Sequence, residues 1–161
     1  DWAVSGHKDK REHNVVNSLY INPQELETLV KARFERYAEI KEKHQMAEEY
    51  LADDADIIIV AYGSSSRVSR SAIDAARKQG IKVGMIRPIT LWPFPEKVIE
   101  KHVGHAKAFL SVEMSMGQMV DDVKLVVNGR VPVEFYGRTG GMIPTPNEVL
   151  EQIVRINGGV Q

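Results

Sequence analysis

Short apolar runs alternate with segments of helical periodicity from residue 57 to the end of the chain, and this alternation constrains the fold most. The runs predict strands, and the segments between them predict helices. The expected strands cover residues 57–62, 82–86, 108–113 and 131–136, and the expected helices cover 66–79, a short segment from 96, 118–127 and a last segment from 146. Strands that are apolar nearly throughout are typical of a parallel sheet covered on both faces. The sequence therefore predicts an α/β fold, with an open, mostly parallel sheet and helices on both faces.

A long charged segment before the first strand predicts a helical arm. Asn22 can cap this helix, Pro23 suits its first turn, and Glu25 occupies the capping-box position. A narrow apolar stripe recurs at helical spacing and contains Leu26, Leu29, Val30, Tyr37 and Ile40, with Phe34 nearby. The helix is expected to run to about Tyr50, which gives about 28 residues and about 42 Å at 1.5 Å per residue.

The chain is accordingly predicted to have three parts. They are a linker over 1–21, a helical arm over 22–52 and an α/β domain over 53–161. The arm either packs on the α/β domain or connects domains or chains.

The first 17 residues, DWAVSGHKDKREHNVVN, show no clear period and no initiating Met, which indicates a cut rather than a natural start. His7, Asp9, Glu12 and His13 lie in this stretch, but they lack a recognised metal-ligand spacing. We therefore predict a solvated linker without a metal site.

Composition excludes several classes of function. The chain has no cysteine, so it holds no disulfide, thiol nucleophile or cysteine-bound iron–sulfur cluster. A formal net charge of -1 provides no strong field for nucleic acid or a membrane surface. There is no run of about 18 apolar residues and no visible signal peptide. We expect a cytoplasmic protein that binds neither nucleic acid nor membrane.

The turn after the first predicted strand, YGSSSR, raises the question of phosphate binding. It lacks the lysine followed by Ser or Thr of a Walker loop, and it has one glycine where a dinucleotide fingerprint needs three. The hydroxyls of Ser64, Ser65 and Ser66 could cap the following helix. Alternatively, the backbone N–H groups of this turn could hold an anion.

The stretch EMSMGQM follows the third predicted strand and opens the next helix. Glu113 ends the strand at the edge where open α/β sheets bind ligands, and the helix dipole there favours its ionised form. Met114, Met116 and Met119 surround a glycine and either pack in the core or form an adaptable contact surface. Gln118 offers both a donor and an acceptor to a neighbouring group.

The remaining polar candidates are weaker. Arg138, in the glycine-rich YGRTGG, either binds an anion or is a surface or ion-paired residue. His44, His102 and His105 lie in charged or helical contexts and form no triad with a serine. We therefore assign no catalytic, cofactor-binding or metal-ligating residue to this chain.

Three stretches carry a resemblance to a known family. The chain resembles the alpha chain of 2-oxoacid:ferredoxin oxidoreductases in ADIIIVAYGSSSRVSRSAIDAARKQGIKVGMIRPITLWPFP and in VEMSMGQMVDDVKLVVNGRVPVEFYGRTGG. It most resembles the branched-chain type, which takes 3-methyl-2-oxobutanoate (2-oxoisovalerate). GHKDKREHNVVN also resembles the stretch that leaves the first domain of that chain, so the resemblance covers almost the whole sequence.

This resemblance implies a linker followed by a domain like the C-terminal domain of transketolase. The complete enzyme would decarboxylate a 2-oxoacid oxidatively, with coenzyme A accepting the acyl group and ferredoxin the electrons. Thiamine diphosphate, magnesium and iron–sulfur clusters are expected in other domains or chains. Expected partners are an N-terminal pyrimidine-binding domain, the beta and gamma/delta subunits and, indirectly, ferredoxin.

The present chain would then have an assembly and support role. Its candidate contacts with neighbouring domains or anions are Ser64, Ser65, Ser66, Glu113, Met116, Gln118 and Arg138. Pyruvate, 2-oxoglutarate or an aryl 2-oxoacid could replace the branched substrate, because the residues that contact substrate are expected outside this chain. The alternative to an oxidoreductase part is a free-standing flavodoxin-like ligand-binding or interaction module without catalysis.

Overall fold

The computed structural model describes residues 6, 8, 10–12 and 16–159, and the chain forms two compact units. One unit is Asp1–Ala38 and the other is Glu39–Gln161, which contains the sheet. The three-part division expected from the sequence stays a prediction. His7, Asp9 and His13 of the linker lie outside the described residues, so the expected absence of a metal site there also stays a prediction.

The predicted arm is a helix, but it is shorter than expected. Helix α1 (Pro23–Lys43) begins as the sequence indicates, because Oδ1 of Asn22 accepts hydrogen bonds from the N–H groups of Gln24 (3.0 Å) and Glu25 (3.2 Å). None of its residues is buried in the described structure. The expected continuation of the helix is wrong, because Ala47–Tyr50 form strand β1.

Pairing within the fold explains why this charged segment is a strand. β1 pairs antiparallel with β3 (Val83–Pro88) at the edge of the sheet. Glu48 pairs with Arg87 of β3 (Oε1 to Nη2 2.7 Å), and Glu49 pairs with Lys101 (Oε2 to Nζ 3.1 Å). Backbone pairing and these ion pairs are available only in the folded chain, and they outweigh the local preference for a helix.

The sheet has the strand order β1-β3-β2-β4-β5, and among the described strands only β1 is antiparallel to its neighbour. The other strands are β2 (Ile57–Val60), β4 (Ala108–Glu113) and β5 (Val133–Gly137). β2 and β4 are buried at every position. β2 is uniformly apolar, as such burial predicts, whereas β4 also buries Ser111 and Glu113, which form a hydrogen bond with each other. The predicted open, mostly parallel sheet is confirmed.

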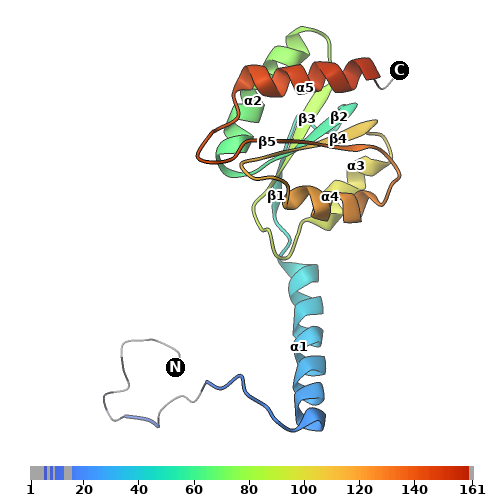
Figure 1. Cartoon of the computed structure of the whole chain (residues 1–161). Helices are drawn as coiled ribbons and strands as arrows, with labels where there is room; N and C mark the ends of the chain where they lie inside the picture. Colours follow the sequence, from blue (N-terminus) through green and yellow to red (C-terminus); the bar gives the residue numbers. More distant parts are fainter. Residues whose placement is uncertain (1–5, 7, 9, 13–15, 160–161) are drawn as a thin grey trace. The chain divides into compact units, whose positions relative to one another are not determined.

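Two helices cover each face of the sheet (Figure 1). Helices α2 (Gly63–Lys78) and α5 (Pro146–Gly159) cover one face, and α3 (Glu96–Val103) and α4 (Met119–Val127) cover the other. Each face has its own hydrophobic core, because successive side chains of a strand point to opposite faces. The core under α2 and α5 includes Ile57, Ile59, Ile73 and Ile153. The core under α3 and α4 includes Ile58, Val60, Ile99 and Val123.

The order of the strands places a switch point beside β2. From β2 the chain passes through α2 to β3 on one side, whereas β4 lies on the other side of β2 and leads through α4 to β5. The direction of progress across the sheet therefore reverses between the carboxyl ends of β2 and β4. Ligands bind at such a point in open α/β sheets, so a binding site is expected at this edge.

Candidate functional site

A small crevice opens at the carboxyl ends of β2 and β4, and its volume is about 160 Å³. Its lining residues are Tyr62, Gly63, Ser64, Ser65, Val112, Glu113, Met114, Ser115 and Gln118. The structure thus brings four of the predicted candidates together from two distant turns. Ser66 lines a neighbouring pocket, and Met116 and Arg138 line neither.

The Glu113 carboxylate is buried in the crevice wall and accepts five hydrogen bonds from its own chain. The donors are the hydroxyls of Ser111 (2.9 Å) and Ser115 (2.8 Å) and the N–H groups of Gln118 (2.9 Å), Met119 (3.2 Å) and Val120 (2.8 Å). Three of these donors open helix α4. The carboxylate therefore caps α4, at the helix end where the dipole favours negative charge.

Burial by itself would raise the pKa of Glu113 and is the largest single influence on it. The hydrogen bonds from Ser115, Gln118, Ser111 and Val120 together outweigh burial, so the pKa of Glu113 lies below its ordinary value. The side chain is ionised at neutral pH. Because five donors already occupy its two oxygens, this carboxylate is not free to act as a general base or to ligate a metal.

Two glycines allow the turn between β4 and α4 to take this shape. Gly117 has a φ of 109°, in the region that favours glycine, and its N–H donates to Ser115 Oγ (3.0 Å). Gly137 ends β5 beside the turn, and a Cβ at this position would lie 2.3 Å from the Ser115 carbonyl oxygen. The backbone of the turn therefore passes where no side chain fits.

The turn between β2 and α2 corrects one prediction. Helix α2 begins at Gly63, three residues earlier than expected, and its N-cap is Tyr62, whose side chain forms no cap hydrogen bond. Ser64, Ser65 and Ser66 therefore lie inside the first turn and cannot cap the helix. The Ser66 hydroxyl donates instead to the Gly63 carbonyl (2.8 Å). The expected helix start was too late because β2 ends at Val60 rather than at residue 62.

A basic pocket adjoins the crevice and shares Gly63 and Ser64 with it. Its volume is about 390 Å³, and it is lined by Glu48, Gly63, Ser64, Ser66, Arg67, Arg70 and Arg87. Sequence reasoning missed its three arginines. The spacing of Arg67 and Arg70 places both on one side of α2 and was a usable signal. Arg87 comes from β3, and only the pairing of the strands brings it near.

The methionines of EMSMGQM divide between the two predicted roles. Met119 is buried in the core under α3 and α4. Met116 is 82% exposed, and Met114 is 45% exposed at the crevice. Gln118 is also exposed. Part of this stretch therefore fills the core, whereas its tip presents a soft apolar surface.

Arg138 is ion-paired, which is one of the roles predicted for it from the sequence. Its guanidinium Nη1 pairs with Oε1 of Glu148, the capping-box residue of α5. Its backbone N–H donates to the Glu113 carbonyl (3.1 Å). Glu148 also accepts from the N–H of Thr145 (2.7 Å), and its own N–H donates to Thr145 Oγ1 (3.3 Å), which is the reciprocal arrangement of a capping box. Arg138 thus joins the turn after β5 to helix α5.

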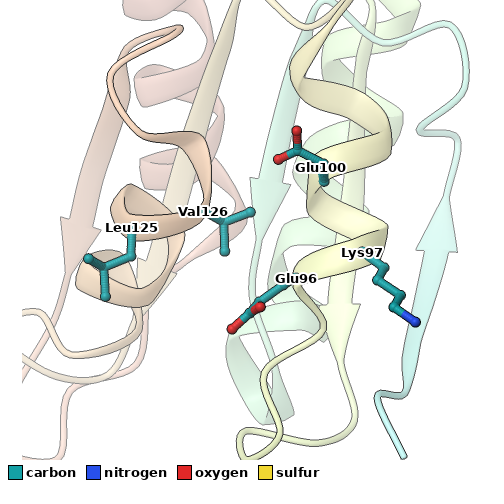
Figure 2. Close-up of a pocket in the computed structure, with 5 residues that line it drawn as sticks. All are labelled: Glu96, Lys97, Glu100, Leu125 and Val126. Atoms are coloured by element: carbon teal, nitrogen blue, oxygen red, sulfur yellow. The ribbon is translucent and has the colours of Figure 1, made fainter. Parts of the chain in front are cut away.

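A further pocket of about 410 Å³ lies between helices α3 and α4, and Figure 2 shows its lining residues. They are Glu96, Lys97, Glu100, Leu125 and Val126. Glu100 is engaged by Arg130, whose hydrogen bond lowers the pKa of Glu100. This pocket lies away from the carboxyl ends of β2 and β4, and each of its three charged lining residues is ion-paired, Glu96 with Lys41, Lys97 with Glu42 and Glu100 with Arg130. We therefore place the candidate site at the switch point.

A second polar cluster lies between β1 and α3. Glu49, Asp53 and His102 each place one ligand atom within 4.8 Å of the others, a spacing that a metal ion could use. His102 is fully buried, with Nε2 bonded to Glu49 and Nδ1 3.4 Å from Nε2 of His105. Nζ of Lys101 lies 3.1 Å from an oxygen of Glu49 and of Asp53, so an ammonium group supplies the positive charge there. The ion pair of Lys101 and the hydrogen bond of His102 with Glu49 hold strand β1 against helix α3.

No helix in the described part of the chain has the length and apolar character needed to cross a membrane.

Comparison with known proteins gives consistent results. The family described as "Pyruvate:ferredoxin oxidoreductase core domain II" matches residues 55–149. Ketoisovalerate oxidoreductase subunit VorB of Methanothermobacter thermautotrophicus is 45% identical over 157 residues, which is 98% of this chain and 44% of that subunit. The chain thus spans less than half the length of this relative.

Two solved structures share the fold. The 2-oxoglutarate:ferredoxin oxidoreductase from Magnetococcus marinus, solved with 2-oxoglutarate, coenzyme A and succinyl-CoA bound, has a TM-score of 0.67 at 21% identity, over 88% of this chain and 24% of its own. A split-gene transketolase, an inactive beta4 tetramer, has a TM-score of 0.58 at 17% identity, over 68% of this chain and 40% of its own. The fold class expected from the sequence, including its likeness to transketolase, is confirmed.

Proposed function

Because the chain belongs to the pyruvate:ferredoxin oxidoreductase core domain II family, we propose that it is part of a subunit of a 2-oxoacid:ferredoxin oxidoreductase. The observation that carries this proposal is the 45% identity to subunit VorB over 98% of the chain. The complete enzyme would convert a 2-oxoacid to an acyl-CoA and reduce ferredoxin. The alternative of a free-standing module without catalysis is not favoured by these relatives.

The proposed substrate is 2-oxoisovalerate. The relative named for ketoisovalerate is 45% identical to this chain over the 157 aligned residues, whereas the structure solved with 2-oxoglutarate is 21% identical over the region it matches. The substrate class in this proposal is carried over from that relative.

The described residues do not fit thiamine diphosphate with magnesium. The cofactor's diphosphate and metal need free carboxylate or carbonyl ligands around an anion-binding turn. At the switch point the buried carboxylate is Glu113, and its oxygens are already engaged by five donors. We therefore propose that thiamine diphosphate, magnesium and the iron–sulfur clusters are held by other domains or subunits, including a pyrimidine-binding domain.

This chain would help to assemble the complete enzyme and would support its active site. The tip of the turn between β4 and α4 offers the surface for this role. Met116 and Met114 are exposed apolar side chains, and Gln118 beside them can donate and accept. Glu113 would act behind this surface by holding the turn in place. We propose that this surface docks against a neighbouring domain of the complete enzyme.

Substrate preference of the complete complex tests the proposed function. With coenzyme A present, the complex should reduce a viologen dye, and kcat/KM should be highest for 2-oxoisovalerate among 2-oxoisovalerate, pyruvate and 2-oxoglutarate. The isolated chain should show no dye reduction because it has no electron carrier. A higher kcat/KM for pyruvate or 2-oxoglutarate would contradict the substrate while leaving the family unchanged, and an inactive, fully assembled complex would contradict the function itself.

The substitution Met116→Lys tests the docking surface. A charge placed in an apolar contact must be desolvated, so association of the complete complex should weaken by about tenfold. The melting temperature of the isolated chain should not change, because Met116 is 82% exposed. Size-exclusion chromatography of the complex and thermal melting of the chain measure the two effects. Leu125→Lys, at an exposed apolar residue on α4, is the matched control and should leave assembly intact. Unfolding of the isolated chain by Met116→Lys would show that this methionine belongs to the core.

A further inference from the structure

The first turn of α2 differs from those of the other described helices in having no acceptor for its N–H groups. Acceptors in the other helices are Asn22 Oδ1 for α1, Gln45 Oε1 for α3, the Glu113 carboxylate for α4 and Thr145 Oγ1 for α5. No described group accepts from the N–H of Gly63, Ser64 or Ser65, and the first helical bond is from Ser66 to Tyr62 (3.3 Å). Three donors and the positive end of the dipole of a 16-residue helix therefore remain unmatched.

The Ser65 hydroxyl is an independent sign of a ligand at this helix end. Ser65 is 4% exposed and lines the crevice, yet its hydroxyl forms no hydrogen bond with any described residue. Ser66 is equally buried, but its hydroxyl is satisfied by the Gly63 carbonyl. The Ser65 oxygen is not fully enclosed, unlike Ser69 Oγ, which is the one enclosed side-chain polar atom without a partner among the described residues. The Ser65 hydroxyl therefore opens into the crevice, and its partner has to come from there. The crevice is where a partner for Ser65 has room.

The charge around this helix end is positive. Arg87 is committed to Glu48 (Nε to Oε2 3.0 Å), and Arg70 lies 4.6 Å from the centre of the Tyr50 ring. Arg67 is exposed at the same pocket and forms no ion pair with a described residue. Glu113, across the crevice, keeps its negative charge, and its two oxygens are engaged by five neutral donors of its own strand and turn. One arginine is therefore available to neutralise an anion at the N-terminus of α2.

We propose that the N-terminus of α2 binds the phosphate group of a small ligand. The N–H groups of Gly63, Ser64 and Ser65 and the Ser65 hydroxyl donate to its oxygens, and Arg67 supplies the counter-charge. The site has neither the lysine nor the repeated glycines of a nucleotide-binding loop, so it holds one phosphate group rather than a nucleotide di- or triphosphate. This proposal does not depend on the proposed oxidoreductase function, because binding is a property of this chain.

Nuclear magnetic resonance of the ¹⁵N-labelled chain tests the site directly. Sodium phosphate titrated at constant ionic strength should shift the amide signals of Gly63, Ser64 and Ser65 saturably, whereas sodium chloride should not. The amides of Gln24 and Glu25, which Asn22 already caps, are the internal reference and should not move. The absence of saturable shifts at residues 63–65, or equal shifts with chloride, would overturn the proposal.

Matched variants assign the donors. Arg67→Gln and Ser65→Ala should each weaken phosphate binding by about fivefold, the loss of one charge-assisted or neutral hydrogen bond. Lys124→Gln, which removes an exposed charge outside both pockets, should leave phosphate binding unchanged. Thermal melting of each variant confirms that its fold is kept. If Arg67→Gln and Ser65→Ala both retain the affinity of the unaltered chain, the proposed site is wrong.

A titration with glycerol phosphate distinguishes the source of the phosphate group. Binding at least as tight as that of orthophosphate supports a phosphate ester on a larger ligand. Weaker but saturable binding of the ester supports a free phosphate ion at the same donors.

Discussion

The substitution Glu113→Gln is expected to lower the free energy of unfolding by about 3–5 kcal/mol at pH 7, because a buried charge with five donors is lost. Glutamine offers one acceptor oxygen, and its amide nitrogen would face N–H groups at the start of α4. At least two of these donors would then stay buried without a partner. Urea unfolding followed by circular dichroism measures the loss. Glu151→Gln, at an exposed residue on α5, is the control and should change stability by no more than about 0.5 kcal/mol.

The effect of Glu113→Gln should depend on pH in a defined direction. The pKa of Glu113 is lower in the folded chain than its ordinary value of 4.5, so the carboxylate stabilises the fold fully above that value. This stabilisation is lost as the pH falls below 4.5 and through the folded pKa, where a protonated Glu113 resembles glutamine. The difference in stability between the unaltered chain and Glu113→Gln should therefore shrink as the solution is acidified. A difference that stays constant from neutral to acid pH would show that the charge is not responsible.

The substitution Gly137→Ala should lower the free energy of unfolding by about 2–3 kcal/mol through overpacking. Its Cβ would lie 2.3 Å from the Ser115 carbonyl oxygen and 2.5 Å from Cζ of Phe135, so the turn between β4 and α4 has to move. Thermal or urea unfolding measures the cost, and the amide signals of residues 115–118 should report the displacement.

Gly104→Ala is the matched control for Gly137→Ala. Gly104 follows α3 with a φ of -72°, and a Cβ there would meet nothing within 4 Å. Its unfolding free energy should stay the same or rise slightly, because alanine restricts the unfolded chain more than glycine does. If both substitutions have the same small effect, the close approach of the turn to β5 is not important for stability.

Local patterns in the sequence were sufficient to predict the fold class. Four apolar runs predicted the parallel strands, and their bounds were right to within a few residues because strand burial on both faces leaves a continuous apolar signal. The caps at Asn22 and Thr145 were also predictable, since each involves residues no more than three positions apart. β1 was missed because its glutamates find Arg87 and Lys101 only after the sheet and α3 have formed.

The candidate site was predicted only in outline. Glu113 and the serines were singled out because they follow apolar strands, where open α/β sheets present their loops. Two hydrogen-bond assignments differ from those expected, because Glu113 is engaged by its own chain and Ser66 bonds the Gly63 carbonyl. Arg138 pairs with Glu148, which was one of its predicted alternatives. Hydrogen-bond partners depend on distances of a few tenths of an ångström, which spacing along the chain does not specify.

Sequence periodicity and composition determine which segments form the sheet and which form the helices that cover it, because strands and helices each bury apolar side chains with their own regular repeat. They also exclude cysteine chemistry within the chain. The strand order, and with it the meeting of the Gly63–Ser65 turn with Glu113, is decided by tertiary structure, because β2 and β4 pair across about 50 intervening residues. The same pairing leaves the first three N–H groups of α2 without an acceptor among the described residues, while α4 receives Glu113. Which helix end stays open for a ligand is therefore a consequence of long-range packing, in which one buried carboxylate can serve one helix only.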